Sequence, residues 1–190
     1  MAEGATDRAL EKRRRVLEAA RGLILREGLR GTTMEAIARE AGIAKATLYA
    51  QFPDKTAVFA GIVDTLLDQL DAAFRQGLAG QGGAAERIGA ALAGQYRVLA
   101  LALEGSPHAA ELMSEHKRSG LVLREQDQAM SGAIAEMLRA AGAEDAEALT
   151  QIVVAGAYGI ALKIRDVERM DAGIRLLCRR LIGPETGAAG

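Results

Sequence analysis

Hydrophobic positions along this chain recur at three- and four-residue intervals, the spacing of amphipathic helices. Alternation of apolar and polar positions, which would predict strands, is almost absent. We therefore expect an all-α protein with about nine helices. Their predicted ranges are 7–26, 34–41, 45–51, 54–78, 84–104, 107–115, 119–141, 145–164 and 168–182. Residues 29–32 are predicted to form a loop, and the Gly-rich residues 77–83 form the clearest break.

The second and third predicted helices are short and follow each other closely. Thr33 is a suitable N-cap, because its hydroxyl can accept a hydrogen bond from a backbone N–H in the next turn. Gly42 permits the positive φ of a sharp turn, and Pro53 cannot continue the next helix. This arrangement predicts a helix-turn-helix unit that buries Leu48 and Phe52. The free side of the last helix would then carry Ala44, Lys45, Thr47, Ala50 and Gln51, with Tyr49 at its flank.

Short and hydrogen-bonding side chains of this kind suit the reading of base edges in a DNA groove. The alternative is an ordinary helical hairpin whose exposed side is polar. The charge distribution permits an anionic partner at this end: residues 1–60 hold 11 Lys+Arg and 8 Asp+Glu (+3), whereas residues 61–190 hold 13 and 17 (−4). The basic run at positions 13–15 is interpreted as a solvated helix face, with contact to the DNA backbone or minor groove as the alternative.

Cellular location and redox state are constrained by what the chain contains. A single cysteine, Cys178, excludes an internal disulfide, fits a reducing compartment and is expected to be a small buried hydrophobe. No apolar run approaches the roughly 18 residues of a membrane span, and the N-terminus is basic and amphipathic rather than signal-like. We expect a cytoplasmic protein.

The stretch "TTMEAIAREAGIAKATLYAQFPDKTAVFAGIV" resembles the N-terminal domain of the TetR (tetracycline-repressor-like) family of transcription regulators. Matching elements are Thr33, Ile37-Ala38, Ala41-Gly42-Ile43, Ala44 to Tyr49, Phe52 and Asp54-Lys55. The resemblance covers about residues 12–63, a third of the chain. Ala50-Gln51 departs from it, because a second aromatic or His often stands there.

The resemblance implies a division of the chain and roles for several residues. The helix-turn-helix domain would span 7–53, a ligand-binding and dimerisation domain 54–183, and a flexible tail 184–190. Thr33, Tyr49 and Lys55 would bind phosphates. Ala44, Lys45, Thr47 and Gln51 would lie in or beside the major groove. The partner would be double-stranded operator DNA.

We expect a homodimer, because a single recognition helix in one DNA groove gives too little affinity and specificity. Two apolar stripes near the C-terminus are the candidates for its interface. The predicted interface residues are Ile152, Val153, Gly156, Ala157, Ile160, Ile174, Leu177, Cys178 and Leu181. Gly156, Ala157 and Gly159 would let a partner helix approach closely. The alternative is that both stripes pack only within their own domain.

A small-molecule site is expected in the C-terminal domain, largely apolar with a few polar groups. Candidate lining residues are Tyr96, Leu99, Leu103, His108, Met113 and Tyr158, the last facing inward. His108, Glu111 and Glu115 could share one helix face, which raises a metal-sensing alternative, although their spacing is not a known ligand motif. No cofactor and no metal are expected.

The sequence thus predicts a ligand-responsive transcriptional repressor that is not an enzyme. No nucleophile–base pair, phosphate loop or dinucleotide glycine motif supports an all-α enzyme. A helical interaction module without DNA binding is a further alternative. The presence of Lys45, Tyr49 and Lys55 argues against it.

Overall fold

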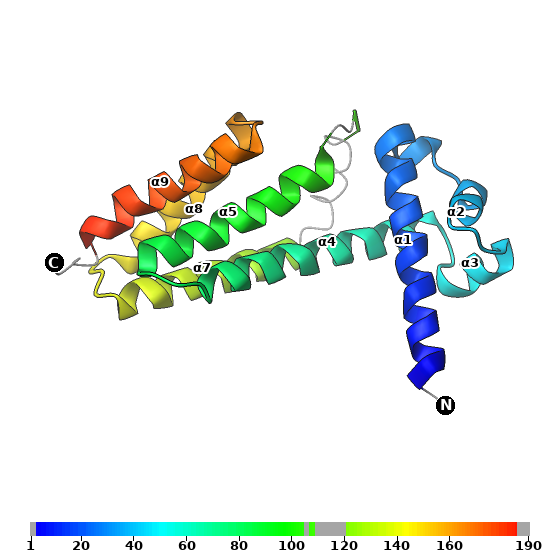
Figure 1. The fold of residues 1–190 in the computed structure, drawn as a ribbon, viewed down its shortest axis with the longest axis horizontal. Helices are drawn as coiled ribbons and strands as arrows, with labels where there is room; N and C mark the ends of the chain where they lie inside the picture. The colour runs from blue at the N-terminus through cyan, green and yellow to red at the C-terminus, as the bar shows by residue number, and fades with distance from the viewer. Residues whose placement is uncertain (1–2, 105–106, 109–120, 186–190) are drawn as a thin grey trace. The chain divides into compact units, whose positions relative to one another are not determined.

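The computed structural model describes residues 3–104, 107–108 and 121–185, and in these ranges the chain is helical without strands (Figure 1). The described helices are α1 (Glu3–Gly31), α2 (Met34–Glu40), α3 (Lys45–Gln51), α4 (Lys55–Leu78), α5 (Ala84–Leu103), α7 (Leu121–Ala140), α8 (Ala146–Lys163) and α9 (Val167–Glu185). The predicted all-α class is confirmed. The predicted helix at 107–115 lies almost wholly outside the described residues, as does most of the predicted tail.

The chain divides into two compact units, and the division falls inside α4, after Leu67. The first unit contains α1, α2, α3 and the start of α4. The second contains the rest of α4 together with α5, α7, α8 and α9. The sequence places its boundary earlier, after residue 53; the first turns of α4 belong to the N-terminal unit because Val58 is buried in that unit's core.

The core of the first unit is formed by one face of α1 and the inner faces of α2 and α3. Its buried members are Val16, Ala20, Leu23, Met34, Ile37, Ala38, Ala41, Leu48, Phe52 and Val58. Figure 1 shows α2 and α3 on the same side of α1. Helices this short are marginal in isolation, so their positions depend on this shared apolar contact.

The end of α1 differs from the predicted loop at 29–32. Gly28 interrupts the helix with φ 77°, yet the chain continues helically to Gly31. Thr32, which is only 1% exposed, closes the turn: its backbone N–H and its hydroxyl both donate to the Gly28 carbonyl, at 3.2 and 2.9 Å. Satisfying this carbonyl allows the junction to be buried.

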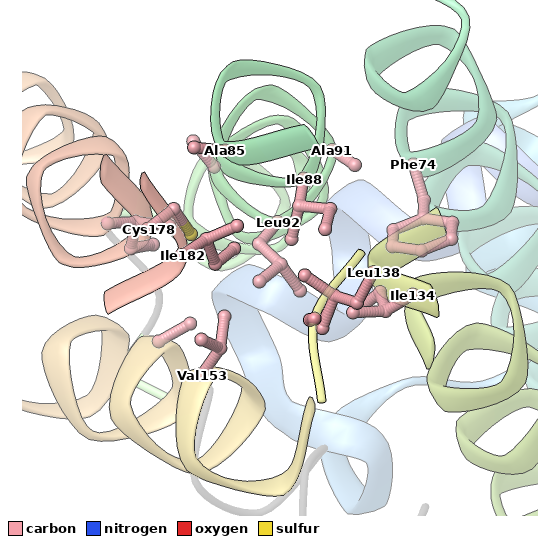
Figure 2. Close-up of a cluster of buried hydrophobic side chains, with 14 of the residues drawn as sticks. Phe74, Ala85, Ile88, Ala91, Leu92, Ile134, Leu138, Val153, Cys178 and Ile182 are labelled. Atoms are coloured by element: carbon pink, nitrogen blue, oxygen red, sulfur yellow. The ribbon is translucent and has the colours of Figure 1, made fainter. Parts of the chain in front are cut away.

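The core of the second unit is an apolar cluster to which all of its helices contribute. Figure 2 shows Phe74 of α4, Leu92 of α5, Leu138 of α7, Val153 of α8 and Ile182 of α9 around it. Phe74 is 5% exposed, and the other four residues are 0% exposed. Leucine, isoleucine and valine side chains buried in this way supply most of the hydrophobic stabilisation of a domain.

Close helix packing in the second unit explains a departure from the predicted Gly-rich loop. Gly77 lies within the last turn of α4 rather than in the loop. A Cβ added there would lie 2.3 Å from the Ala91 backbone of α5. Glycine at this position therefore lets two helices cross closely.

No described helix is long and apolar enough to cross a membrane.

Candidate nucleic-acid interface

The turn between α2 and α3 is closed by backbone hydrogen bonds around Gly42. The Ile43 N–H donates to the Ala38 carbonyl at 3.0 Å, and the Gly42 N–H donates to the Arg39 carbonyl at 3.2 Å. With φ 64° at Gly42, these two bonds form a Schellman motif. The predicted turn at Gly42 is confirmed, and it is closed by two backbone hydrogen bonds.

Both ends of α2 have side-chain partners. The Thr33 hydroxyl accepts from the Ala36 N–H at 3.1 Å, which confirms the predicted N-cap. At the other end, Arg15 of α1 donates from Nη2 to the Ala41 carbonyl at 2.7 Å. The arginine satisfies a C-terminal carbonyl that the helix leaves unbonded, and it joins α1 to the α2–α3 turn.

α3 buries little and exposes much of its surface. Leu48 is the only buried residue within the helix, and Phe52, also buried, follows at its end. Ala44, Lys45, Ala46, Tyr49 and Ala50 are exposed, and Thr47 is half-buried. Of the residues predicted to contact DNA, Thr33, Ala44, Lys45 and Tyr49 are therefore exposed, whereas Thr47, Gln51 and Lys55 are half-buried.

Lys45 is not isolated on that surface. Its ammonium group forms an ion pair with Glu35 of α2, and it lies 5.9 Å from the centroid of the Tyr49 ring. The hydrogen bond from Lys45 lowers the pKa of the Glu35 carboxyl. Both side chains are more than half exposed, so water and salt weaken the pair. A phosphate group can therefore compete with Glu35 for Lys45.

Two predicted DNA contacts have different surroundings from those expected. Lys55 donates from Nζ to the backbone carbonyls of Leu29 and Thr32, at 2.6 and 2.9 Å. Gln51 is half-buried, and its Oε1 is buried without a hydrogen-bond partner. Sequence reasoning missed both arrangements; in the case of Lys55, the partners are distant along the chain.

The basic run at positions 13–15 is exposed, as predicted for a solvated helix face, and each of its arginines also has a partner. Arg13 lies 4.4 Å from the centroid of the Phe52 ring, and Arg15 binds Ala41 as described. Arg14 forms ion pairs with Glu11 and Glu18 on its own helix. The acidic residues at i−3 and i+4 are the one sequence signal that indicates the Arg14 pairs.

The predicted small-molecule residues are only partly described. Tyr96, Leu99, Leu103 and His108 are half-buried, whereas Met113 lies outside the described residues. Tyr158 is 51% exposed, so the expectation that it faces inward is wrong. Burial raises the pKa of the Tyr96 hydroxyl to about 12, with smaller contributions from Asp127 and Tyr158. Of the predicted metal trio, only His108 is described; Glu111 and Glu115 are not.

The predicted interface residues fall into two groups. Val153, Ala157, Ile174 and Cys178 are 0% exposed and pack in the core of their own chain. Burial also raises the pKa of the Cys178 thiol to about 11. Gly156 accommodates Leu177 of the same chain, since an added Cβ would lie 2.7 Å from Leu177 Cδ2. Ile152 remains on the surface at 57% exposure, and Ile160 and Leu181 are half-buried.

Sequence reasoning missed two further exposed apolar residues, one on α8 and one on α9. Leu162 of α8 is 63% exposed, and Leu176 of α9 is 48% exposed. Gly159 has no atom within 4 Å of the position of an added Cβ. Ile152, Gly159 and Leu162 share one helix face by their spacing of seven and three residues. Extending the stripe along this face would have identified Leu162.

Comparison with known proteins begins with the N-terminal unit. Residues 16–62 match the family model described as "Bacterial regulatory proteins, tetR family". This match covers α2, α3 and the Gly42 turn completely, together with parts of α1 and α4. Among curated proteins, none matches the sequence.

Solved structures share the fold over nearly the whole chain. A transcriptional regulator from Rhodococcus sp. Rha1 has 18% identity and a TM-score of 0.65, covering 93% of this chain and 98% of that one. Salmonella enterica GusR has 22% identity and a TM-score of 0.63, covering 92% and 96%. A TetR/AcrR-family regulator from Thermobifida fusca has 22% identity and a TM-score of 0.62, covering 88% and 97%.

Because these identities are low, the solved structures show only that the fold is shared. The family model matches the sequence of the N-terminal unit. Both comparisons agree with the two short helices α2 and α3 joined by the turn at Gly42. Residues 16–62 thus carry the sequence pattern of the tetR family of bacterial regulatory proteins, and the chain shares the fold of solved TetR-like transcriptional regulators.

Proposed function

We propose that this protein is a dimeric, ligand-responsive transcription regulator, acting as a repressor that a small effector releases from operator DNA. The observation that carries the DNA-binding part is the surface of α3. This helix is anchored by a single buried residue, Leu48, and by the hydrogen-bonded turn at Gly42, and it leaves Lys45, Ala46, Tyr49 and Ala50 exposed.

The exposed residues have chemistry suited to duplex DNA. Thr33 and Tyr49 carry hydroxyl groups that can donate to phosphates, and Lys45 carries a positive charge. Ala44 and Thr47 are small enough to allow close approach to base edges in the major groove. Gln51 contributes less in this proposal, because its carbonyl oxygen is buried.

Binding of the full chain to duplexes selected from a random-sequence DNA pool tests this proposal. We expect the logarithm of the affinity to fall linearly with the logarithm of the salt concentration. Tyr49→Phe should weaken binding to all sequences similarly, because a phosphate contact carries no sequence information. Wild-type protein that selects no sequence and shows no salt-dependent binding would refute the assignment.

The dimer proposal rests on the exposed apolar residues of α8 and α9. Ile152, Leu162 and Leu176 are each about half exposed or more. The exposed face of α8 also includes Gly159, where a partner helix could approach closely. The proposed interface therefore keeps Ile152 from the sequence prediction. It includes Gly159, Leu162 and Leu176 in place of the predicted residues that are buried within their own chain.

Sedimentation velocity of charge-inserted variants tests the interface. Leu162→Glu and Leu176→Glu should yield monomers, because an unpaired carboxylate would be buried between the protomers. Leu101→Glu is the matched control, since Leu101 is 50% exposed on α5, outside the proposed interface. Equal behaviour of all three variants would exclude this face.

The effector proposal rests on α5. The half-buried Gln95 has a buried Oε1 without a hydrogen-bond partner, and Tyr96 next to it is held in its neutral form. These groups suit a largely apolar molecule that carries one hydrogen-bond donor. A thermal-shift screen of such compounds should identify stabilising ligands whose effect is lost in Gln95→Leu. Ligands that stabilise both proteins equally would place the site elsewhere.

A further inference from the structure

Lys55 begins α4, but its ammonium group lies at the junction between α1 and α2. Nζ donates to the Leu29 carbonyl at 2.6 Å and to the Thr32 carbonyl at 2.9 Å. An ammonium group has three N–H donors, so two of the three are used by the backbone of the chain itself. The side chain is half-buried, in contrast to the exposed Lys45.

The two carbonyls explain why a cation is stabilised there. The Leu29 carbonyl lies in the last turn of α1, where carbonyl groups lack partners within the helix and partial negative charge accumulates, and Thr32 directly follows the helix. The neighbouring Gly28 carbonyl already accepts two hydrogen bonds from Thr32. Lys55 therefore supplies hydrogen bonds to two carbonyls of a partly buried junction.

The same junction determines where Thr33 lies. Thr33 follows Thr32 directly, is exposed, and caps α2 through the Ala36 N–H. On the other side, Asp54 precedes Lys55 and accepts from the Ala57 N–H at 2.8 Å, which caps α4. The start of α4 is thus connected through one side chain to the residue that precedes the α2 cap.

We propose that Lys55 is a positioning residue that holds Thr33 and the start of α2 in the DNA-binding geometry, rather than a phosphate ligand. This inference rests on the proposed DNA-binding function. Lys55 acts through the α1–α2 junction, whereas Lys45 acts on DNA directly.

The salt dependence of DNA binding separates these two roles. Each phosphate contact contributes about 0.9 to the slope of log affinity against log salt. We expect Lys55→Met to lower affinity for the selected duplex about tenfold, in line with the loss of charge-assisted hydrogen bonds, while the slope stays unchanged. Lys45→Met should reduce the slope by about 0.9 for each protomer. Lys163→Met, on the exposed end of α8, is the control that leaves both quantities unchanged.

Amide hydrogen exchange of the DNA-free protein gives an independent measurement. Lys55→Met should accelerate exchange at the N–H groups of Thr32 and Ala36, which bond to Gly28 and Thr33. Lys55→Arg should restore most of the protection, because guanidinium also donates to two carbonyls. Should Lys55→Met not fold, Lys55→Gln replaces it in both measurements.

A slope reduced by about 0.9 for each protomer in Lys55→Met, with unchanged amide exchange, would overturn the proposal and assign Lys55 to a phosphate. Accelerated exchange with an unchanged slope supports it. If the wild-type chain binds no DNA, the proposed function fails, and the positioning role for DNA fails with it. Exchange at the junction then still shows whether Lys55 holds the α1–α2 connection.

Discussion

The chain uses the same turn twice, with opposite consequences for the helix that follows. At the end of α2, Gly42 has φ 64°, and the Ile43 N–H donates to the Ala38 carbonyl at 3.0 Å. At the end of α7, Gly142 has φ 90°, and the Ala143 N–H donates to the Leu138 carbonyl at 3.0 Å. Both are Schellman motifs with glycine in the left-handed region.

The helices after the two turns differ in length and burial. α3 has 7 residues and buries only Leu48 within its length, whereas α8 has 18 residues and buries Ala146, Thr150, Val153 and Ala157. The turn determines where the chain changes direction. The side chains after it decide whether the next helix is enclosed by the core or left accessible to a partner.

The largest expected effect comes from removing the single anchor of α3. Leu48→Ala should reduce the free energy of unfolding by about 3 kcal/mol, through lost burial and the cavity that remains. Val153→Ala in α8 should cost less, about 2 kcal/mol, because fewer methyl groups are lost. Urea unfolding followed by far-UV circular dichroism measures both values.

The buried thiol of Cys178 shows which unit opens in each variant. Since its pKa is raised to about 11, the reactive thiolate is scarce at neutral pH. Alkylation of the folded protein should therefore be slow and should accelerate as pH rises toward that value. Leu48→Ala should leave Cys178 protected, whereas Val153→Ala should expose it. Equal exposure in both variants would mean that the two units unfold together.

The two glycine turns should be similar in stability but different in function. Gly42→Ala and Gly142→Ala each place a side chain at positive φ, which costs about 1–2 kcal/mol. A Cβ at Gly142 would meet no atom within 4 Å, and one at Gly42 would meet only the flexible Arg15 side chain, at 3.3 Å. Thermal unfolding should show comparable losses.

DNA binding then distinguishes these turns. Only Gly42→Ala should reduce affinity for the selected duplex, because it alone alters the angle at which α3 leaves α2. If Gly142→Ala lowered DNA affinity as much as Gly42→Ala, the accessible surface of α3 would not explain how the two regions differ in DNA binding.

A smaller effect is expected from the charge on α3. Lys45→Ala should lower DNA affinity and reduce the salt slope by about 0.9 for each protomer. Lys163→Ala, on the exposed last turn of α8, should change neither value. Fluorescence anisotropy titrations over a series of salt concentrations provide the measurement, and an unchanged slope for Lys45→Ala would remove this residue from the interface.

The smallest effect is expected from Glu35, the acidic partner of Lys45. Glu35→Gln should raise DNA affinity about two- to threefold, because Lys45 no longer leaves an ion pair and one negative charge near phosphates is removed. Stability should change little, since both side chains are exposed. Glu147→Gln, which breaks the exposed pair with Arg139 elsewhere in the chain, is the matched control. Reduced affinity in Glu35→Gln would instead indicate that the pair orients Lys45 for binding.

The elements of the N-terminal unit were predictable because their signals are local. Thr33 caps α2, Gly42 turns the chain and Pro53 follows α3, and each acts within a few residues of its position. The predicted bounds of α3 agree with the structure, and those of α2 agree to within a residue. The family resemblance depends on these same local features.

Side-chain partners that are distant in sequence depended on the fold. Lys55 meets Leu29 across 26 residues, and Arg15 meets Ala41 across 26 as well. Gly156 was expected to admit a partner protomer, yet it admits Leu177 of its own chain. Periodicity shows that a helix has an apolar stripe, but it cannot show which neighbour covers that stripe.

The sequence by itself determined the helices, the glycine corner and the polar surface of α3, because capping, left-handed glycine and helical periodicity are properties of short segments. Only the tertiary structure decided that Lys55 is directed into the α1–α2 junction, that Cys178 is enclosed and that Leu162 is exposed. Those outcomes depend on which helices pack together, and packing is set by the combined burial of residues far apart in the chain.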